Sequence, residues 1–298
     1  MKYLLPILAL SLLIACQSEP TPATQSEIPF AEQPQARVPD AWIADRTEAV
    51  RAQLAGSTAG QRVLESMQAH GGLENFYRNG PLEFTFDYRP LDGSTRRYST
   101  QQVDTWNHRA RHQDAQNPSA EFGWTGKNAW TTDTSAFAYD LRFWALTPYY
   151  FLGQPFVFAG EGVQLEDLGK RNWNGTDYDA VKVTFAAGTG DAPDDYYVAY
   201  FHPVTKLQEV IRYIVSYPAY FPDGGHLPEK MMVLEDFTTV SGITFPTRYR
   251  TFWLDDNEQP GEHITTITVS NIAFNATLPK SHFDQPVGSI SLGDTAVE

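Results

Sequence analysis

From Leu82 onward, apolar and polar side chains alternate along the chain, which is the period of a β-strand with one buried face. The run from Leu82 to Tyr88 shows the pattern most clearly, since Leu, Phe, Phe and Tyr are separated by Glu, Thr and Asp. Short connectors with turn residues separate such runs, so neighbouring strands should be antiparallel, because parallel neighbours need long crossovers. The predicted strands are 82–88, 97–105, 108–114, 121–125, 128–132, 178–185, 195–201, 207–216, 231–239, 245–254 and 264–274.

Before these strands the hydrophobic period is helical. We expect one helix over 41–54 with Asp40 as its N-cap, and a second from about Ser57 to Gly71, followed by a short turn that leads into the sheet. Long helices do not alternate with the strands, and the sequence contains no repeat. The pattern therefore predicts a mainly β (α+β) fold, in which N-terminal helices precede one large curled antiparallel sheet that forms an unclosed or half barrel.

An aromatic segment interrupts the strand series. Residues 137–158 include nine aromatic side chains in 22 positions, whereas 13% of the whole chain is aromatic. Apolar side chains cover nearly every face of a helix over 141–146, and Pro148 is predicted to start a second short helix that ends at Gly153. A helix that is apolar all round is buried or lines an apolar space. We therefore expect this insertion against the concave face of the sheet.

Two interpretations of the aromatic insertion remain open. It is either a plug that fills the core of the curled sheet, or a lid over an apolar ligand cavity. Under the second interpretation its large side chains bind the ligand, because aromatic and aliphatic groups are the usual lining of such sites. The candidate ligand-binding residues are Phe143, Trp144, Leu146, Tyr150, Phe151, Phe156 and Phe158.

The N-terminus has the pattern of an export signal. Lys2 supplies a positive charge, and the apolar run that follows is roughly 13 residues long, too short for a spanning helix of about 20. The run ends Leu13-Ile14-Ala15-Cys16, which resembles the bacterial lipobox. The resemblance implies that residues 1–15 are a signal peptide and that Cys16 receives the lipid. Gln17 rather than Asp follows, which by resemblance to sorted lipoproteins implies anchoring in the outer membrane, facing the periplasm.

Composition divides the rest of the chain. Residues 16–39 are rich in Pro, Ser, Thr and Gln, which predicts an extended tether that reaches up to roughly 70 Å. Residues 40–287 are predicted to form a single domain, and residues 288–298 an acidic flexible tail. The net charge of −14 disfavours nucleic acid as a partner. Cys16 is the only cysteine, so a disulfide within the chain is excluded. We expect a monomer.

The order of these features resembles the lipoprotein-localisation factors LolA and LolB. The segments 149–158 and 162–163, with 181–185 leading into 188–191, are similar to a family of uncharacterised bacterial outer-membrane lipoproteins of that general fold. The likeness spans roughly 57–287. It implies an unclosed barrel of antiparallel strands that is capped by helices and holds acyl chains.

Motifs for catalysis and metal binding are weak. His108 and His112 have a zinc spacing for a helix, but on the predicted strand they lie about 13 Å apart, too far for one metal. The loop with Asp191, Asp194 and Asp195 is a weak calcium candidate, since it lacks the alternating ligands of an EF-hand and has the composition of a solvated turn. The sequence contains no G-x-S-x-G, H-E-x-x-H or phosphate-loop motif. We therefore expect no catalytic residue, no cofactor and no metal.

Three functional hypotheses follow from the sequence. The first is a non-enzymatic envelope lipoprotein, anchored to the membrane by its N-terminal lipid, that binds an apolar ligand such as a lipid or acyl chain in the concavity of its sheet. The alternative is a structural or interaction module of the cell envelope, with a filled core and loops that contact another protein. The third is a hydrolase or calcium-dependent enzyme, for which the loop of carboxylates is the only basis.

Overall fold

The computed structural model describes residues 38–192 and 194–292. The predicted signal peptide at 1–15, the lipidation site Cys16 and the tether up to residue 37 lie outside the described residues. A single antiparallel sheet dominates the described part of the chain. Its strands are β1 (Leu82–Pro90), β2 (Arg97–Asp104), β3 (Arg109–Asp114), β4 (Glu121–Trp124), β5 (Ala129–Thr131), β6 (Val163–Trp173), β7 (Thr176–Phe185), β8 (Tyr197–Phe201), β9 (Gln208–Tyr213), β10 (Lys230–Val240), β11 (Ile243–Leu254), β12 (Pro260–Phe274) and β13 (Ile290–Ser291).

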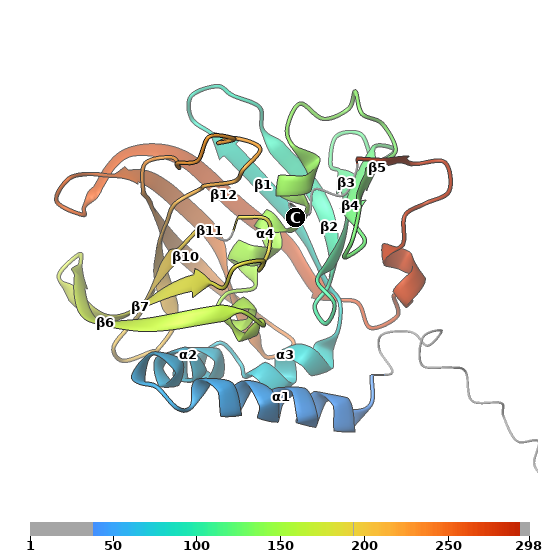
Figure 1. Cartoon of the computed structure of the whole chain (residues 1–298). Helices are drawn as coiled ribbons and strands as arrows, with labels where there is room; N and C mark the ends of the chain where they lie inside the picture. Colours follow the sequence, from blue (N-terminus) through green and yellow to red (C-terminus); the bar gives the residue numbers. More distant parts are fainter. Residues whose placement is uncertain (1–37, 193, 293–298) are drawn as a thin grey trace, which may run out of the picture.

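The sheet curls strongly without closing into a barrel (Figure 1). Its 13 strands run in the order β13-β5-β4-β3-β2-β1-β12-β11-β10-β9-β8-β7-β6, so β13 and β6 are its two ends. Except for β1 with β12 and β5 with β13, each strand pairs with its neighbour in the sequence, as short connectors require. The predicted fold class, an unclosed and mainly β antiparallel sheet with helices, is therefore confirmed.

Two strands were not predicted from the sequence. β6 is an end strand, and polar or charged residues such as Glu166 and Lys170 lie on both of its faces. Its side chains are half-buried or exposed, so apolar alternation is weak there. β13 pairs with β5 through Ile290 and Ser291, inside the stretch 288–298 that the sequence predicts to be a tail.

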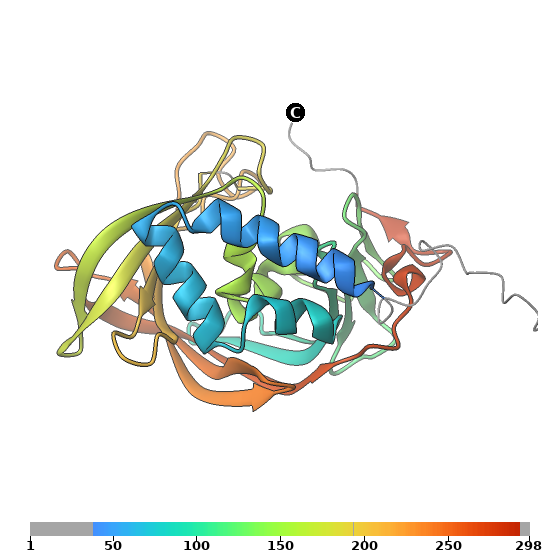
Figure 2. The ribbon, with the colours of Figure 1, turned by 90° about the horizontal axis from the view of Figure 1, so that it is seen from below.

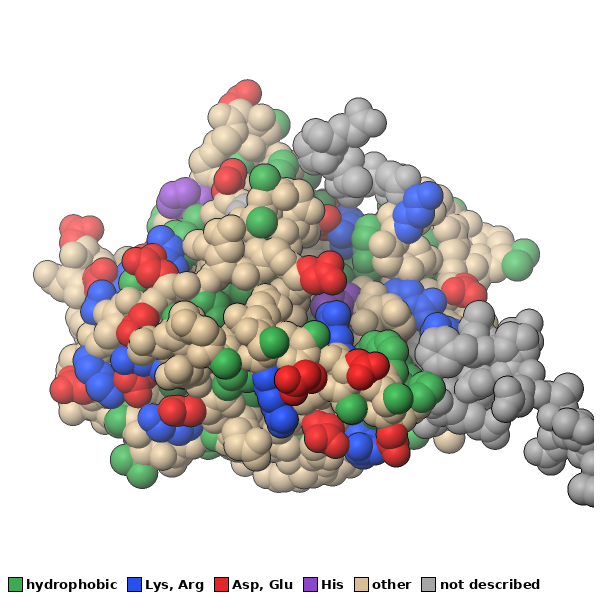
Figure 3. Space-filling view, turned by 60° about the horizontal axis from the view of Figure 1, so that its bottom comes forward, with side chains coloured by type: hydrophobic (Ala, Val, Ile, Leu, Met, Phe, Trp, Pro, Cys, Tyr) green, Lys and Arg blue, Asp and Glu red, His purple; other side chains and the backbone are tan. Residues whose placement is uncertain are grey.

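Three helices, α1 (Asp40–Leu54), α2 (Thr58–Ala69) and α3 (Leu73–Asn79), lie together across one end of the curled sheet (Figure 2). The prediction of Asp40 as an N-cap is wrong: Asp40 is the first helical residue, and no side chain caps α1. Ser57 does cap α2, since its hydroxyl accepts a hydrogen bond from the Gly60 N–H at 3.0 Å. On this face of the molecule Lys and Arg side chains are interspersed with Asp and Glu (Figure 3).

Buried contacts fasten the helices to the sheet. His70, directly after α2, is fully buried, and its Nδ1 lies 2.7 Å from the Thr244 carbonyl oxygen. Its Nε2 accepts a hydrogen bond from the Gln208 N–H at 3.1 Å. The next residue, Gly71, has φ +115°, and a Cβ there would lie 2.0 Å from the Gly242 carbonyl oxygen. Only glycine allows this close approach of the two backbones.

The aromatic insertion forms helix α4 (Leu141–Leu152), which lies on the concave side of the sheet (Figure 1). Asp140 caps it by accepting the Phe143 N–H at 2.9 Å, and Gly153 follows its last turn. The predicted break before Pro148 is wrong, because α4 continues through this proline as one helix. A proline inside a helix removes one backbone hydrogen bond. Burial of the side chains on both sides of Pro148 compensates for that loss.

Candidate functional site: a cavity beside helix α4

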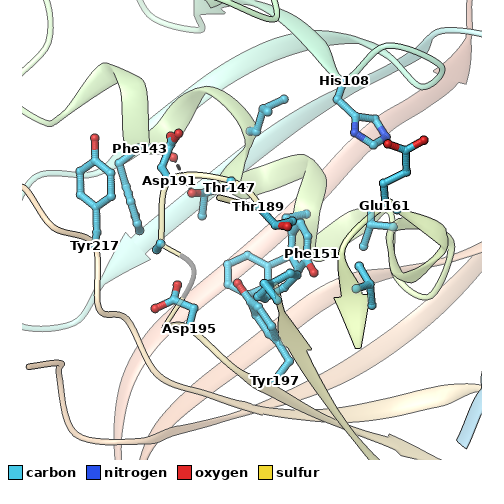
Figure 4. A pocket seen from close by; sticks show the side chains of 18 of the residues that line it. His108, Phe143, Thr147, Phe151, Glu161, Thr189, Asp191, Asp195, Tyr197 and Tyr217 are labelled. Carbon is cyan, nitrogen blue, oxygen red and sulfur yellow. Dashed lines mark hydrogen bonds between the residues drawn. The ribbon is translucent and has the colours of Figure 1, made fainter. Parts of the chain in front are cut away.

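A cavity of about 510 Å³ lies between α4 and the β6–β9 side of the sheet (Figure 4). Several segments that are distant in sequence contribute to its wall: α1, the β2–β3 turn, α4, the start of β6, the β7–β8 loop, and the end of β9 with the residues after it. The lining residues include Arg46, His108, Arg142, Phe143, Leu146, Tyr150, Phe151, Glu161, Phe185, Thr189, Asp191, Asp195, Tyr197, Tyr213, Val215 and Tyr217.

Aromatic rings form the long walls of this cavity. Tyr150 on α4 lies 5.0 Å from Tyr197 on β8, measured between ring centroids, and Phe151 lies 5.4 Å from Tyr213 on β9. The rings of Tyr197 and Tyr213 are stacked at 6.0 Å, so two neighbouring strands present one continuous aromatic surface. Phe185 on β7 extends this surface by contacting both Tyr150 and Tyr197.

Four of the seven predicted ligand-binding residues line the cavity: Phe143, Leu146, Tyr150 and Phe151. The other three do not. Trp144 faces the other side of α4, where its ring meets that of Tyr88 at 4.8 Å. Phe156 stacks on Phe76 of α3 at 4.3 Å, and Phe158 is fully buried. One side of α4 therefore packs in the core as the plug interpretation requires, whereas another side borders open space as the lid interpretation requires.

The strand and turn residues of the lining were not predicted as site residues. Tyr197 and Tyr213 lie on predicted strands, and both pack in the main hydrophobic cluster. Alternation along a strand indicates which of its faces is buried. It does not distinguish an inner residue that α4 covers from one that stays open to the cavity, because this depends on where α4 lies. Arg46 and His108 carry no signal in the sequence, since they reach the cavity from a helix and a turn that are distant along the chain.

The β7–β8 loop closes one side of the cavity. Arg142 on α4 forms an ion pair with Asp191 of this loop at 2.6 Å, and its guanidinium carbon lies 3.4 Å from the centre of the Trp124 ring. The loop also packs closely against the turn before β6, because a Cβ on Gly162 would lie 2.1 Å from the Thr189 Oγ1. The ion pair and this contact hold the loop against α4 and β6.

The calcium candidates in this loop are engaged in other interactions. Asp191 is paired with Arg142, and Asp195 accepts hydrogen bonds from the Ser216 N–H at 2.6 Å and hydroxyl at 2.8 Å. Burial raises the pKa of both carboxyls. Asp194 is exposed and is not part of the lining. In the part of the chain that the structure describes, no three His, Cys, Asp or Glu side chains are grouped to hold a metal ion.

The phenol groups along the cavity are neutral hydrogen-bonding groups. Burial raises the pKa of Tyr150, Tyr197 and Tyr213 above the ordinary value, so none of them ionises near neutral pH. The Tyr150 hydroxyl is buried without a hydrogen-bond partner in the protein.

None of the described helices is both long and apolar enough to cross a membrane. No protein-family model matches the sequence, and no curated protein sequence matches it.

Among solved structures, the fold is similar to that of a LolA superfamily protein from Nitrosomonas europaea, at 12% identity over 77% of this chain and 99% of that chain, with a TM-score of 0.48. It is also similar to a DUF1329 family protein from Desulfovibrio piger, at 11% identity over 82% and 97%, with a TM-score of 0.47. An outer membrane lipoprotein-sorting protein domain from Vibrio parahaemolyticus matches at 11% identity over 75% and 95%, with a TM-score of 0.46. These likenesses concern the overall fold and carry no information about a ligand.

Proposed function

We propose that this protein is a non-enzymatic lipoprotein of the bacterial envelope that binds an apolar ligand, a lipid or acyl chain, in the cavity beside α4. The observation that carries the proposal is the space of about 510 Å³ that is lined in large part by aromatic side chains. Protein interiors are close-packed, and their voids rarely exceed the size of a water molecule. Small-molecule sites are instead clefts of about 300–1,000 Å³ lined mainly by apolar groups, and this cavity matches that description.

The polar groups of the lining support binding rather than catalysis. The Arg142 and Asp191 charges are paired with one another, and the Asp195 carboxylate is held by Ser216. A nucleophile needs a neighbouring base within about 3 Å that activates it. The hydrogen bonds of Asp191 and Asp195 fasten the wall of the cavity, which is a structural role.

The envelope location in this proposal rests on the N-terminal sequence. The lipobox-like Leu13-Ile14-Ala15-Cys16 supports lipidation of Cys16, and the residues after it support a tether. Outer-membrane anchoring on the periplasmic side is proposed from Gln17. Attached lipid adds about 0.8 kcal/mol of binding energy for each buried CH₂ group, so two or more acyl chains would keep the folded part at the membrane.

Binding of a neutral apolar fluorophore tests the proposed function. We expect N-phenyl-1-naphthylamine to bind the delipidated protein saturably, with one site for each chain. Leu146→Trp places a bulky side chain in the cavity and should weaken this binding at least tenfold. Val204→Trp is a matched control, because Val204 is 81% exposed and is not part of the lining. The control should bind like the original chain.

Circular dichroism and thermal unfolding would establish that both variants are folded. Absence of saturable binding, or equal binding by the Leu146→Trp variant, would contradict a ligand cavity. In that case the interaction-module hypothesis would become the better account.

A further inference from the structure

The α1 end of the cavity, formed by Arg46 and His108, differs chemically from its aromatic walls. Arg46 lies on α1 and His108 in the β2–β3 turn, and both line the cavity. The two segments are held together by Trp42 and Trp106, whose rings meet at 6.2 Å. Because Trp42 precedes Arg46 by one helical turn, and Trp106 is two residues before His108, this contact directs both polar side chains to the same end.

Arg46 is in none of the ion pairs within 4.0 Å among the described residues, and its charge opposes the rise that burial causes in the pKa of Tyr77. The buried carboxylate of Asp104 is engaged by other groups. It accepts the Trp106 and Asn107 N–H groups at 3.1 Å and pairs with Arg109 at 3.0 Å. The positive charge of Arg46 is therefore free to act on a molecule in the cavity.

The other charged groups of the lining are compensated or lie at the rim. Arg142 and Asp191 form an ion pair with one another, and Asp195 is held by Ser216. Glu161 is exposed and lies near His108 in Figure 4. These two side chains do not form an ion pair within 4.0 Å. Asp191 and Asp195 lie away from His108 in the same view. The α1 end is thus separate from the ion pair that closes the β7–β8 loop.

His108 occupies an unusual backbone conformation for its position. Its φ of +51° lies in the left-handed region, where a residue with a side chain is uncommon and glycine is favoured. His108 is an exposed residue, and its side chain is part of the cavity lining. Burial lowers the pKa of His108, and the Arg46 charge lowers it further, whereas the Asp104 carboxylate opposes this change. The imidazole is therefore neutral at pH 7 and retains one N–H donor.

Building on the proposed function, we propose that the ligand is an amphiphile with one apolar chain and a single anionic head group, which Arg46 and His108 bind. A guanidinium donates paired hydrogen bonds to a carboxylate or a phosphate, and the imidazole N–H adds a third donor. If each chain carbon takes about 30 Å³, as one water does in the liquid, the cavity has room for about 17 carbons. This is the size of one acyl chain.

The charge pattern around this end also limits the head group. The chain carries a net charge of −14, so the α1 end is a local exception on an acidic protein. Glu161 at the same end offsets part of the Arg46 charge, so a head group with two negative charges is repelled more strongly than one with a single charge. A free carboxylate and a phosphodiester share the required chemistry, and the experiment must distinguish them.

Competition against N-phenyl-1-naphthylamine tests the head-group specificity. Oleate, oleyl alcohol and oleoyl-lysophosphatidylglycerol carry the same chain with a carboxylate, a neutral hydroxyl and a phosphodiester. We expect at least one of the two anions to displace the fluorophore at a concentration tenfold or more below that of oleyl alcohol. The anion that does so identifies the head group.

Variants of Arg46 make the test specific. Arg46→Gln should remove the preference for the anion while oleyl alcohol binds as before, and Arg46→Lys should retain part of it. Arg51→Gln is the matched control, since Arg51 is exposed on the same helix and is not part of the lining. His108→Gln gives an independent readout and should reduce the preference several-fold.

Two results would overturn this inference. One is equal displacement by oleyl alcohol and both anions, and the other is an equal loss for the anion and the alcohol in Arg46→Gln. Failure of all three amphiphiles to displace a bound fluorophore would likewise overturn it while leaving an apolar site. If the fluorophore itself does not bind, the proposed function fails as well.

Discussion

The Nε2 atom of His112 lies 2.8 Å from the carbonyl oxygen of Ala145, and this contact joins β3 to the middle of α4. The other ring nitrogen lies 3.3 Å from the Ser99 Oγ, and the ring stacks on Phe122 at a centroid distance of 4.2 Å. The imidazole therefore donates to the helix and accepts from the serine hydroxyl. Because both ring nitrogens form hydrogen bonds, His112 fixes the position of α4 relative to β3. The cavity lies on the opposite side of α4 from this contact.

This arrangement predicts that the fold loses stability in mild acid. Burial lowers the pKa of His112 to about 4, and burial also lowers the pKa of His70 to about 4. Each histidine should contribute its full stabilisation above pH 6.5, the pKa of the unfolded chain, and lose it as the pH falls towards 4. A shift of this size corresponds to about 3 kcal/mol for each histidine. Urea unfolding at pH 7.5 and pH 4.5 measures the change.

The variant His112→Gln separates this effect from the titration of carboxylates. Its free energy of unfolding should depend less on pH between 6.5 and 4 than that of the original chain. His226→Gln is the control, because His226 is exposed, and it should leave the pH dependence unchanged. Identical pH profiles for the original chain and His112→Gln would show that the buried imidazole is not the cause.

The close contact of Gly71 with the β10–β11 turn predicts that a larger residue at this position destabilises the fold. Gly71→Ala would place a Cβ 2.0 Å from the Gly242 carbonyl oxygen and would put alanine at φ +115°. We expect a loss of about 3 kcal/mol or more in the free energy of unfolding, because the helices must shift away from the β10–β11 turn. Gly56→Ala is the comparison, since a Cβ there meets no atom within 4 Å. A loss of less than 1 kcal/mol in Gly71→Ala would contradict this close contact.

The ion pair between α4 and the β7–β8 loop predicts a kinetic effect on the ligand. Asp191→Asn leaves the partly buried Arg142 without its carboxylate, which should reduce stability by about 2 kcal/mol. The loop should then open more often, so stopped-flow dissociation of N-phenyl-1-naphthylamine should become faster. Asp194→Asn alters an exposed carboxylate of the same loop and should change neither quantity. Unchanged dissociation in Asp191→Asn would mean that the loop does not control exit from the cavity.

The left-handed conformation of His108 predicts that replacing this residue by glycine raises the stability of the fold and weakens ligand binding. His108→Gly relieves the backbone strain and should raise the free energy of unfolding by up to about 1 kcal/mol. It also removes the imidazole from the cavity, so the preference for an anionic amphiphile should decrease. Ser241→Gly is the matched control, because Ser241 has φ +50° in the β10–β11 turn and lies outside the lining. The control should gain stability without a change in binding, and equal binding by both variants would argue against a role for His108.

The sequence predicts those helices and strands that bury one face and expose the other. Alternation revealed most strands, and the capping serine before α2 marked a helix start. β6 was not predicted, because this end strand has no deeply buried face and its sequence therefore does not alternate between apolar and polar residues. The break at Pro148 was predicted from local propensity, and tertiary burial of the surrounding aromatic side chains overrides it.

The site was predictable only in part, for a geometric reason. Aromatic density indicated that α4 is buried, but density alone does not show which side of a helix meets other side chains. Trp144 and Phe151 have the same sequence signal, yet Trp144 packs on Tyr88 and Phe151 borders the cavity. Arg46 reaches the cavity through the contact of Trp42 with Trp106, a pairing that no spacing in the sequence indicates.

A crystal structure with 9,10-dibromostearate tests most directly whether the cavity is a ligand site, because bromine scatters anomalously and marks the position of the chain. The account predicts bromine peaks in the cavity beside Phe151 on α4 and Tyr213 on β9, with the carboxylate next to Arg46. Bromine peaks only on the outer surface, or a cavity without bromine at a saturating concentration of the acid, would contradict it.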